Sequence, residues 1–515
     1  MKNLLFLLLL LPAIGVNAQV NWADDISLLI YNKCTRCHHT GGAAPFTLMS
    51  YQDAVSSASM INQVLNDGSM PPWPADTSYR RFANENVLTA EEKFSILDWI
   101  NNGTPSGNLS NAPTPPTYTP GESELDTIDY TVEIDPYTLQ YNTDEYRWFV
   151  VETNFADTVY VSKIEVMPGL PHVVHHADIS YDMTGNSLAL DNSDPLPGFN
   201  SSTGAPTYSH YMNAWQPGAD IAEYPDDWGI MIPPGADFVL EIHYGPGGIG
   251  QTDTTKMNLQ FITNSTNNVR PVYANWLLTD SPPVLVDGPL VIPANQMRTF
   301  HQERTINTAL SLISISPHMH YLGQSYKVWA VTPLNDTIQL IDIPKWDFNW
   351  QRYYHFPVIQ YLPAGTTIYS EGVYDNTTNN PYNPNNPPQT VNQGPYTTDE
   401  MFLCYFIYAQ YQPGDENIII DSATAWLNVG HLDGLEAQLY PNPANNFLNV
   451  QLSENVSENV LFEIYSTEGK LLKSVSKVSD SNGTYQIMLA TLPKGFYYLL
   501  YKHKDREGIA KFIKN

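Results

Sequence analysis

The spacing of apolar side chains changes along the chain, and the change separates a helical part from a β-rich part. Apolar side chains recur at helical intervals over Phe94–Ile100, directly after a capping-box pattern at Thr89–Glu92. From Tyr130 onward, apolar residues form short runs rich in Val, Ile, Tyr and Thr, separated by Pro, Gly, Asn and Asp. The first pattern predicts a small all-α domain, and the second predicts antiparallel β-sandwiches.

The best strand candidates are spread through the β-rich part. They are Thr158–Val166, Phe238–Tyr244, Leu310–Ile315, Tyr326–Val331 and Met401–Ala409. Before the last of them, Asn376–Thr398 is dense in Asn and Pro, which predicts a long loop. A last segment with strand-like alternation begins near Gln438 and predicts a small C-terminal β-sandwich.

The first residues form a separate apolar segment. Lys2 precedes the apolar run Leu4–Pro12, and Val16–Ala18 supplies a small-residue cleavage site. This pattern predicts a signal peptide over residues 1–18, with an apolar core too short to span a bilayer. No later stretch reaches the roughly 20 apolar residues of a transmembrane helix. We therefore expect export across the inner membrane and no transmembrane segment.

Proline content and charge divide the chain further. Residues 108–121 are Pro-rich and predict a semi-rigid linker after a domain at residues 19–107. The formal net charge is −29, and because residues 433–515 are balanced, the acidic excess lies in residues 19–432. An acidic body repels phosphate backbones, so we expect no nucleic-acid partner. The acidic charge favours a cationic substrate or a basic redox partner. The simpler interpretation is that the acidic surface only maintains solubility.

A haem-attachment pattern lies in the helical part. Cys34, Cys37 and His38 form a Cys-x-x-Cys-His pentapeptide, the spacing that binds c-type haem covalently with the histidine as axial ligand. A zinc site or a disulfide is the alternative. Met70, in a Pro-rich loop, is our candidate for the second axial ligand, and a His/Met pair suits electron transfer. Its rivals are His39, Met49 and Met60, and a core-packed Met70 is the structural alternative.

Residues 25–107 resemble the small cytochrome c domains that are fused to bacterial redox enzymes. The matching stretches are Cys34–His38, Ala44–Tyr51, Met70–Trp73 and Phe82–Asn84, leading to Leu88.

Histidines cluster in two places in the β-rich part. His175 and His176 are adjacent in one strand context and His243 lies on another strand, and three imidazoles without cysteine suit copper, zinc or iron. Neighbours on an ideal strand point to opposite faces, so His175 and His176 share a metal only where the strand is bent, bulged or at an edge. Ordinary surface or core histidines are the alternative. His172 and His210 stay unassigned on that ground.

The second cluster is His318 and His320, whose spacing puts both imidazoles on one strand face. Met401 follows the Asn/Pro-rich loop. A thioether with two imidazoles favours copper and stabilises Cu(I), whereas zinc rarely uses methionine. A methionine packed in a dry core is the alternative for Met401.

In this order the motifs of residues 125–432 resemble the copper type II, ascorbate-dependent monooxygenases, the family of peptidylglycine alpha-hydroxylating and dopamine beta-monooxygenases. The resemblance implies two jelly-roll-like sandwiches, residues 122–272 and 273–432, with one copper in each across an open solvent cleft. It implies that one copper, bound by His175, His176 and His243, relays an electron. It implies that the other, bound by His318, His320 and Met401, activates dioxygen, so that a carbon is hydroxylated and water is formed.

The chain departs from this family at several positions. Ser316 stands where peptide hydroxylases carry an arginine for the substrate carboxylate. Leu403 stands where an asparagine is expected, although Tyr405 keeps an aromatic hydroxyl nearby. A glycine-extended peptide is therefore not the expected substrate. Glu241 replaces a glutamine and has no assigned role, and the family's disulfides are absent because Cys404 is the one cysteine outside the haem motif.

Residues 438–515 resemble the type A sorting domain of the type IX secretion system. The matching stretches are Leu439–Pro443, Ile464–Lys470, Leu492–Tyr498 and Lys511–Lys514. The resemblance implies passage across an outer membrane by the export machinery, then release or attachment at the cell surface. A small carbohydrate-binding or structural sandwich is the alternative.

Together these patterns lead us to expect an exported, haem-linked dicopper monooxygenase that hydroxylates a C–H bond of a small substrate with dioxygen. Its cofactors are two copper ions and one covalent haem c, with ascorbate left open as a reductant. Tethering the cytochrome raises its effective concentration at the copper cleft to roughly the millimolar range. An electron-transfer or copper-binding surface protein without hydroxylase activity is the main alternative, and a glycan-binding module with incidental histidines is another.

Overall fold

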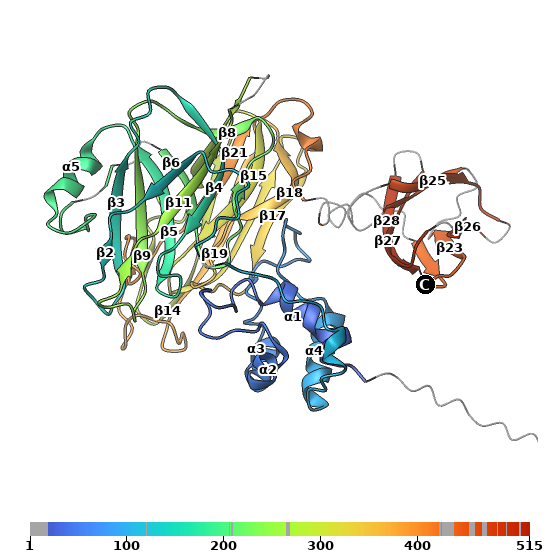
Figure 1. The fold of residues 1–515 in the computed structure, drawn as a ribbon. Helices are drawn as coiled ribbons and strands as arrows, with labels where there is room; N and C mark the ends of the chain where they lie inside the picture. The colour runs from blue at the N-terminus through green and yellow to red at the C-terminus, as the bar shows by residue number, and fades with distance from the viewer. Residues whose placement is uncertain are drawn as a thin grey trace, which may run out of the picture. The chain divides into compact units, whose positions relative to one another are not determined.

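The computed structural model describes residues 19–514 with short gaps (Figure 1). The gaps are residues 120, 205, 208–209, 264–267, 422–423, 425–436, 453–458, 466–470, 481–482, 491 and 504–505. The expected signal peptide, residues 1–18, lies outside the described residues, as does part of the Ile464–Lys470 motif. The chain forms two compact units. Unit 1 is Met1–Pro72 with Asn86–Pro120, and unit 2 is Trp73–Glu85 with Gly121–Asn515.

Unit 1 is helical, as the apolar spacing of its sequence predicts. Its elements are η1 (Trp22–Ile26), α1 (Ser27–Lys33), α2 (Tyr51–Ser56), α3 (Ala58–Asp67), α4 (Ala90–Asn101) and η2 (Leu109–Asn111). The capping box before α4 is present, because the Glu92 N–H donates to the Thr89 hydroxyl and the Glu92 carboxylate accepts the Thr89 N–H. The indole rings of Trp22 and Trp99 lie 5.7 Å apart in the core.

The boundaries of unit 1 differ from the predicted domain in two places. Trp73–Glu85, expected within residues 19–107, belongs to unit 2, because Phe82 enters an apolar core there. Part of the expected linker instead packs in unit 1, where Tyr118 stacks on His39 at a ring-centroid distance of 4.0 Å. The Pro-rich segment therefore begins where the helices end, but part of it packs in unit 1 and does not act as a linker.

Unit 2 is built on one long sheet. The strand order is β1 (Tyr130–Glu133), β11 (Lys256–Phe261), β4 (Val159–Met167), β8 (Trp228–Ile232), β12 (Arg270–Leu278), β21 (Leu403–Gln410), β15 (Leu310–His318) and β18 (Tyr354–Leu362), with β7 (Ala222–Glu223) beside β4. The β12 strand pairs parallel with β8 and antiparallel with β21, so it joins the two halves of this sheet.

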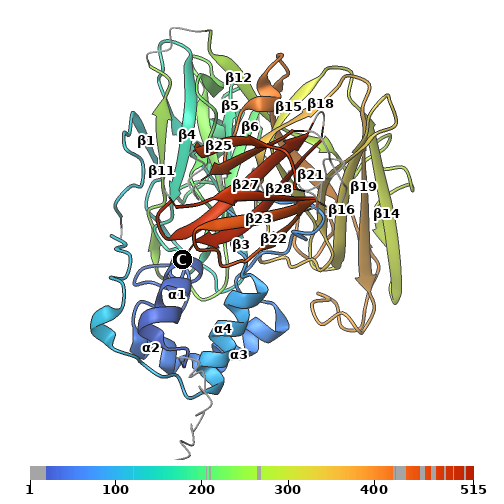
Figure 2. The ribbon, with the colours of Figure 1, turned by 90° about the vertical axis from the view of Figure 1, so that its right-hand side faces the viewer.

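A separate four-stranded sheet covers each half of the long sheet. The first is β3 (Glu145–Glu152), β9 (Asp237–Tyr244), β5 (Val174–Asp182) and β6 (His210–Trp215), with helix α5 (Asn186–Ser193) beyond β5 in the chain. The second is β14 (Gln296–Thr305), β19 (Thr367–Asn376), β16 (Gly323–Val331) and β17 (Thr337–Ile343). Figure 2 shows β1, β4 and β11 on one side and β14, β16 and β19 on the other. Each half has its own apolar core, so two sandwich-like layers share one sheet.

Short elements complete unit 2. They are the pairs β2 (Tyr137–Thr138) with β10 (Thr252–Asp253) and β13 (Val291–Ile292) with β20 (Val391–Asn392), and the turn η3 (Asp415–Asn417). The five predicted strands correspond to β4, β9, β15, β16 and β21. Met401 differs, because it lies two residues before β21 begins at Leu403. The predicted loop after β19 is irregular except for β20.

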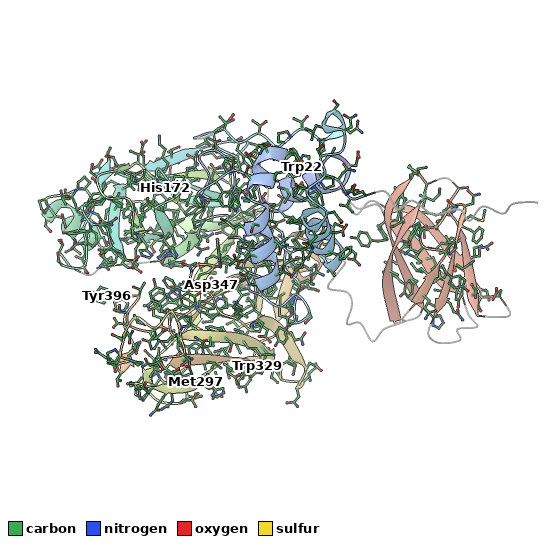
Figure 3. The ribbon with its side chains drawn as sticks, turned by 90° about the horizontal axis from the view of Figure 1, so that it is seen from below. Trp22, His172, Met297, Trp329, Asp347 and Tyr396 are labelled. Carbon is green, nitrogen blue, oxygen red and sulfur yellow. The ribbon has the colours of Figure 1, made fainter. Side chains whose placement is uncertain are left out.

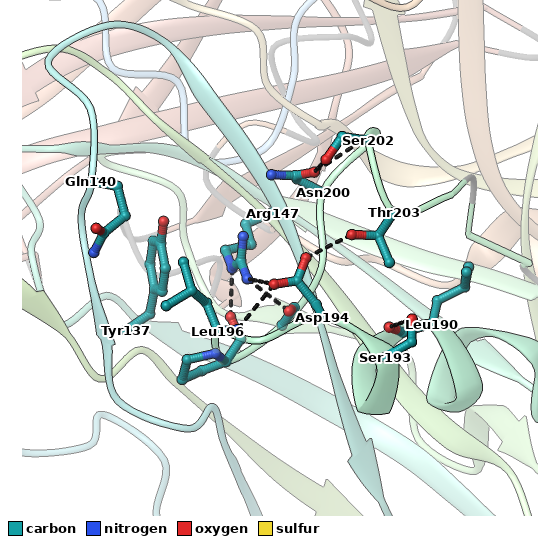
Figure 4. Close-up of polar contacts among 12 residues, drawn as sticks. Tyr137, Gln140, Arg147, Leu190, Ser193, Asp194, Leu196, Asn200, Ser202 and Thr203 are labelled. Carbon is teal, nitrogen blue, oxygen red and sulfur yellow. Dashed lines mark hydrogen bonds and ion pairs between the residues drawn. The ribbon is translucent and has the colours of Figure 1, made fainter.

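A buried arginine fixes β3 at the side of the first sandwich (Figure 4). The guanidinium of Arg147 is 1% exposed and donates to the Asp194 carboxylate at 2.9 Å and to the carbonyl oxygen of Gly198 at 2.8 Å. It also lies 4.6 Å from the centre of the Tyr137 ring. Because side chains alternate along a strand, this anchorage leaves Tyr146 on the opposite face of β3.

Residues 437–514 form a small sandwich of two sheets. One sheet is β22 (Ala437–Tyr440), β23 (Phe447–Leu452) and β26 (Thr484–Met488), and the other is β25 (Leu471–Lys477), β24 (Val460–Tyr465), β27 (Gly495–His503) and β28 (Arg506–Lys514). Leu448, Phe462 and Tyr485 lie in its core. This agrees with the small C-terminal sandwich expected from the alternation of apolar residues.

Candidate metal centres

A β-bulge brings the adjacent histidines His175 and His176 together. In the ladder between β5 and β9, Val174 pairs with Tyr244 and His176 pairs with His243, and the register shifts between Val174 and His176. His175 is the extra residue of the bulge. The strand irregularity that two adjacent histidines require to share one metal is therefore present at this position.

The three imidazoles of this first site converge. One ring nitrogen from each of His175, His176 and His243 lies within 4.8 Å of the others, and the Nδ1 atoms of His175 and His176 are 3.3 Å apart. The Nε2–H of His243 donates to Asp144 Oδ1 at 3.1 Å. Its Nδ1 is buried and has no hydrogen-bond partner within the described part of the chain. A buried lone pair without a donor is what a metal ligand presents.

Burial keeps two histidines of the first site, His175 and His176, neutral. Burial, with a contribution from His243, lowers the pKa of His175 to about 4, and the same causes hold the pKa of His176 well below its usual range. The hydrogen bond from His243 lowers the pKa of Asp144. The ring of Tyr146 stacks on His243 with centroids 4.2 Å apart. Neutral imidazoles with fixed rings are the form in which histidine binds a metal.

The second site lies where β15 ends. In the ladder with β21, His318 pairs with Leu403, and continuing this register by two residues places His320 opposite Met401. The rings of His318 and His320 are 5.2 Å apart and nearly perpendicular. His320 Nδ1–H donates to the carbonyl oxygen of Asp399 at 3.1 Å, which leaves its Nε2 as the ligand atom. The backbone N–H groups of His320 and Met401 also share the acceptor Glu400 Oε2, so the backbones of these two residues lie close together.

Glu400 holds the two chain segments of the second site together. Its carboxylate accepts the backbone N–H groups of His320 at 3.0 Å, Leu322 at 2.7 Å and Met401 at 3.3 Å. Burial raises the pKa of Glu400 to about 8, against the lowering effect of these N–H groups. Glu400 was not predicted from the sequence, where only its position directly before Met401 distinguishes it.

The histidines of the second site are also neutral. Burial and the neighbouring His320 lower the pKa of His318 to about 3, against an opposing effect of Gln351. Burial lowers the pKa of His320 to about 4, although the carbonyl of Asp399 opposes it. Both imidazoles are thus able to bind a metal at neutral pH without first losing a proton.

One phenyl ring lies against both sites. Phe348, which is 7% exposed, stacks on His175 with centroids 5.5 Å apart and meets His320 edge-on at 6.0 Å. Figure 3 shows the neighbouring Asp347 between the sandwich that carries His172 and the one that carries Met297. The family resemblance implies an open solvent cleft between the coppers, whereas here a buried side chain stands between His175 and His320.

Acidic and aromatic side chains line the wall next to the sites. Asp178 and Glu241 face each other across β5 and β9, and burial together with Glu241 raises the pKa of Asp178. Glu241 accepts the indole N–H of Trp148 at 2.8 Å. The Tyr211 ring lies 5.0 Å from Tyr405.

This wall reaches the second site through Tyr405, whose ring lies 6.5 Å from His318. Ser316, which pairs with Tyr405 in the ladder, is buried, and so is Leu403. Ser316 and Leu403, which differ from the residues of the peptide hydroxylases, offer no positive charge to a substrate.

The haem motif of unit 1 lies in a turn directly after α1. The N–H groups of Cys37 and His38 donate to the carbonyl of Cys34 at 3.3 and 3.0 Å. His38 Nδ1–H donates to the carbonyl of Phe46 at 3.1 Å, which leaves Nε2 as the atom for axial ligation. Neither cysteine forms a disulfide with any described residue, and burial followed by the effect of Cys37 raises the pKa of Cys34 to about 12.

The candidates for the second axial ligand differ in their surroundings. Met70 follows α3 in the loop after Gly68, and its N–H donates to the carbonyl of Val64. Met60 is 53% exposed, and His39 Nδ1–H donates to the carbonyl of Thr35. Outside the two sites of unit 2, His172 is exposed and His210 stacks on Tyr181.

Comparison with known proteins identifies one segment. Residues 438–515 match the family described as secretion system C-terminal sorting domain. No curated protein matches the chain. The sorting domain indicates export, with a location at the cell surface or in the medium. Within the described ranges, every helix is too short or too polar to cross a membrane.

Likeness to solved structures is weak. A beta-glucuronidase from Faecalibacterium prausnitzii is 11% identical with a TM-score of 0.18, and the match covers 49% of this chain and 47% of that one. A peptide-N(4)-(N-acetyl-beta-D-glucosaminyl) asparagine amidase is 11% identical with a TM-score of 0.23, over 55% of this chain and 97% of that one. Dimeric latent PorU from Porphyromonas gingivalis is 10% identical with a TM-score of 0.14, over 72% and 34%. The chain spans less than half of the glucuronidase, and these likenesses carry no argument about function.

Proposed function

We propose that this chain is an exported, haem-linked dicopper monooxygenase that hydroxylates a C–H bond of a small substrate with dioxygen. The observation that carries the proposal is the pairing of two imidazole sets in unit 2. One set has three histidines, the other has two histidines beside Met401, and both lie against the ring of Phe348.

The residues fit copper at both sites. Three imidazoles with a bound carboxylate behind His243 suit a copper that cycles between Cu(I) and Cu(II), and the thioether of Met401 favours Cu(I) at the second site. Copper at these sites would supply one-electron redox chemistry and the binding of dioxygen. Burial holds His175, His176, His318 and His320 neutral. Asp144 and the carbonyl of Asp399 fix the tautomers of His243 and His320.

The residues of unit 1 fit a covalent haem. Cys34 and Cys37 have the required spacing and form no disulfide with any described residue, and His38 keeps Nε2 available for iron. A c-type haem would supply electrons one at a time. Hydroxylation takes two electrons from a reductant, so a donor within the same chain matches two coppers that each store one.

The side chains near the second site indicate which charge a substrate could carry. Asp178, Glu241 and Ser316 offer no positive counter-charge to a substrate carboxylate. Tyr211 and Tyr405 instead offer aromatic surface. A neutral or cationic small molecule therefore suits this site better than a peptide that ends in a carboxylate.

The test is oxygen consumption by copper-loaded protein that depends on reductant and on substrate. Met401→Ile should lose most of this activity while keeping the copper of the first site, because only the second site loses a ligand. Wild-type protein that binds copper and accepts electrons, yet consumes no oxygen with any substrate tried, would support an electron-transfer protein instead. The uncharged Ser316 and Leu403 are the observations that favour that second candidate.

A further inference from the structure

A short segment between two strands contacts histidines of both candidate metal sites. Residues 347–351 lie between β17 and β18, and we call them the bridging segment. The ring of Phe348 stacks on His175 of the first site and meets His320 of the second edge-on. Asp347, at the start of the segment, lies between the two sandwiches of unit 2 (Figure 3). The bridging segment is therefore placed to act on both sites.

Hydrogen bonds within the bridging segment give it a defined turn. Asp347 Oδ1 accepts the backbone N–H and the side-chain Nδ2–H of Asn349, both at 3.0 Å. The Trp350 N–H donates to the carbonyl of Asp347 at 3.1 Å. An aspartate that accepts from the backbone two residues on forms an Asx-turn. The amide nitrogen of Asn349 is thus engaged, which leaves its Oδ1 for a further contact.

Asn349 reaches the first site. Burial lowers the pKa of His175, and a hydrogen bond with the side chain of Asn349 opposes this effect. A hydrogen bond that raises the pKa of an imidazole is one in which the ring N–H donates. Asn349 Oδ1 is therefore the acceptor for His175. Asp144 has the same role toward His243.

Gln351 reaches the second site. In the ladder between β15 and β18, Ile315 pairs with Tyr354, and continuing this register places Gln351 opposite His318. Gln351 Nε2–H donates to the carbonyl of Phe348 at 2.9 Å. Its Oε1 is buried and accepts no well-formed hydrogen bond from the described residues, although Gln351 is close enough to His318 to oppose the effect of burial on the pKa of that ring. A buried acceptor beside a neutral imidazole can take the ring N–H that a metal does not displace.

The bridging segment is held from both sandwiches. Just before it, the Trp346 N–H donates to the carbonyl of Gln324 in β16 at 2.8 Å. Just after it, the Tyr353 hydroxyl donates to the Tyr211 hydroxyl in β6 at 3.1 Å. The β16 strand belongs to the second sandwich and β6 to the first. The segment is therefore fixed relative to the ligands of each site.

We infer that the bridging segment positions one histidine of each metal site, with Asn349 acting on His175, Gln351 acting on His318, and the ring of Phe348 serving as a packing surface for both sites. This inference rests on the proposed function, because it concerns copper at these sites. All three are positioning residues, since they act through the histidines. A hydrogen bond from a ligand histidine to such a residue fixes the ring and raises its affinity for the metal.

The test measures the Cu(I) affinity of each site in full-length protein by competition with a chelator. The first site is measured in His320→Ala protein and the second in His243→Ala protein, so that one site remains in each. Asn349→Ala should weaken the first site by about tenfold and leave the second unchanged. Gln351→Ala should weaken the second site by about tenfold or more and leave the first unchanged.

Phe348 should be the residue whose change affects both sites. Phe348→Leu should weaken each site by about tenfold, because both sites lose the ring that packs against a ligand, and Phe348→Tyr should keep both affinities. Phe155→Leu is the matched control, since Phe155 is partly buried in the first sandwich and packs on Tyr130 and Phe261.

Two further variants separate positioning from a general loss of stability. Gln351→Glu keeps an oxygen acceptor toward His318 and should recover most of the affinity. Asn275→Ala, which removes an exposed amide that donates to the Tyr408 hydroxyl, should change neither site. Unchanged affinities in Asn349→Ala and Gln351→Ala, or equal losses at both sites in each of them, would overturn the inference.

Oxygen consumption separates this outcome from failure of the proposed function. Protein that shows the site-selective losses of affinity and consumes no oxygen contradicts hydroxylation and supports the inference. Protein that hydroxylates while its copper affinities ignore the bridging segment contradicts the inference alone. Protein that binds no copper contradicts both.

Discussion

The His175/His176/His243 site is built on paired strands, whereas the His318/His320/Met401 site lies where a strand ends and a loop returns. At the first site a bulge turns two adjacent histidines together, and a carboxylate, Asp144, orients the third. At the second site a backbone carbonyl orients His320, and Glu400 ties the loop to the clamp.

The difference between the sites has a chemical consequence. A rigid ladder with three nitrogen ligands suits a centre that changes oxidation state with little rearrangement. A clamp of two imidazoles with a thioether supplied from a loop is softer and suits a centre that binds and releases an additional ligand. We therefore propose that dioxygen binds at the second site, and the following predictions test that proposal.

The largest expected effect concerns carbon monoxide, a stand-in for dioxygen at Cu(I). His320→Ala should remove carbon monoxide binding and lower hydroxylation by more than about 100-fold, beyond the range typical of residues that only orient a ligand. His176→Ala should also impair turnover while keeping carbon monoxide binding, because the second site stays intact. Infrared spectroscopy of the reduced protein measures both. Retained carbon monoxide binding in His320→Ala would reverse the assignment.

The next effect concerns Glu400, whose carboxylate connects Met401 to the segment that carries His320. Glu400→Ala leaves three backbone N–H groups without their acceptor, and we expect a loss on the order of 3 kcal/mol in unfolding free energy. Copper should be lost from the second site and kept at the first. Denaturant unfolding and copper titration measure the two effects. Glu371→Ala, at a carboxylate that is 46% exposed, is the control and should change neither.

A smaller effect is expected at Asp144, which orients His243 by accepting its Nε2–H. Asp144→Ala should weaken copper binding at the first site by about 10- to 100-fold and leave the second unchanged. Asp144→Asn keeps an oxygen acceptor and should recover part of the affinity. Competition with a Cu(I) chelator reports the affinities. Asp287→Ala, which removes an acceptor of His301 elsewhere, is the control.

The smallest effect is the pH dependence of the copper-free protein. The pKa values of His175 and His320 are about 4 and that of His318 is about 3 in the folded chain, all below the value of 6.5 for an exposed histidine. Between pH 6.5 and about 4 the unfolded chain therefore binds more protons, so stability should fall as pH falls through this window.

Variants at the second site sharpen this prediction. Replacing both His318 and His320 by Gln should make the decline shallower, and replacing the exposed His301 by Gln should leave it unchanged. Urea unfolding at a series of pH values measures the slope. An equally steep decline in the double variant would show that these histidines do not set it.

The sequence predicted which histidines come together better than it predicted the residues that hold them in place. Adjacent His175 and His176 can share a metal only where the strand is irregular, and the structure has a bulge at this position. Asp144, Phe348 and Glu400 were not predicted, because their roles depend on strand register and on contacts between distant segments. The sequence placed Phe82 in the cytochrome, whereas its burial in unit 2 follows from a core that no local pattern reveals.

The most direct test of the central claim is the metal content of purified full-length protein, measured together with that of His243→Ala and His320→Ala. We expect two coppers and one haem iron per chain for the wild type. We expect one copper for each variant, with different paramagnetic resonance spectra because different sites remain. Wild-type protein that folds, holds haem and binds no copper, or variants that both keep two coppers, would contradict the claim.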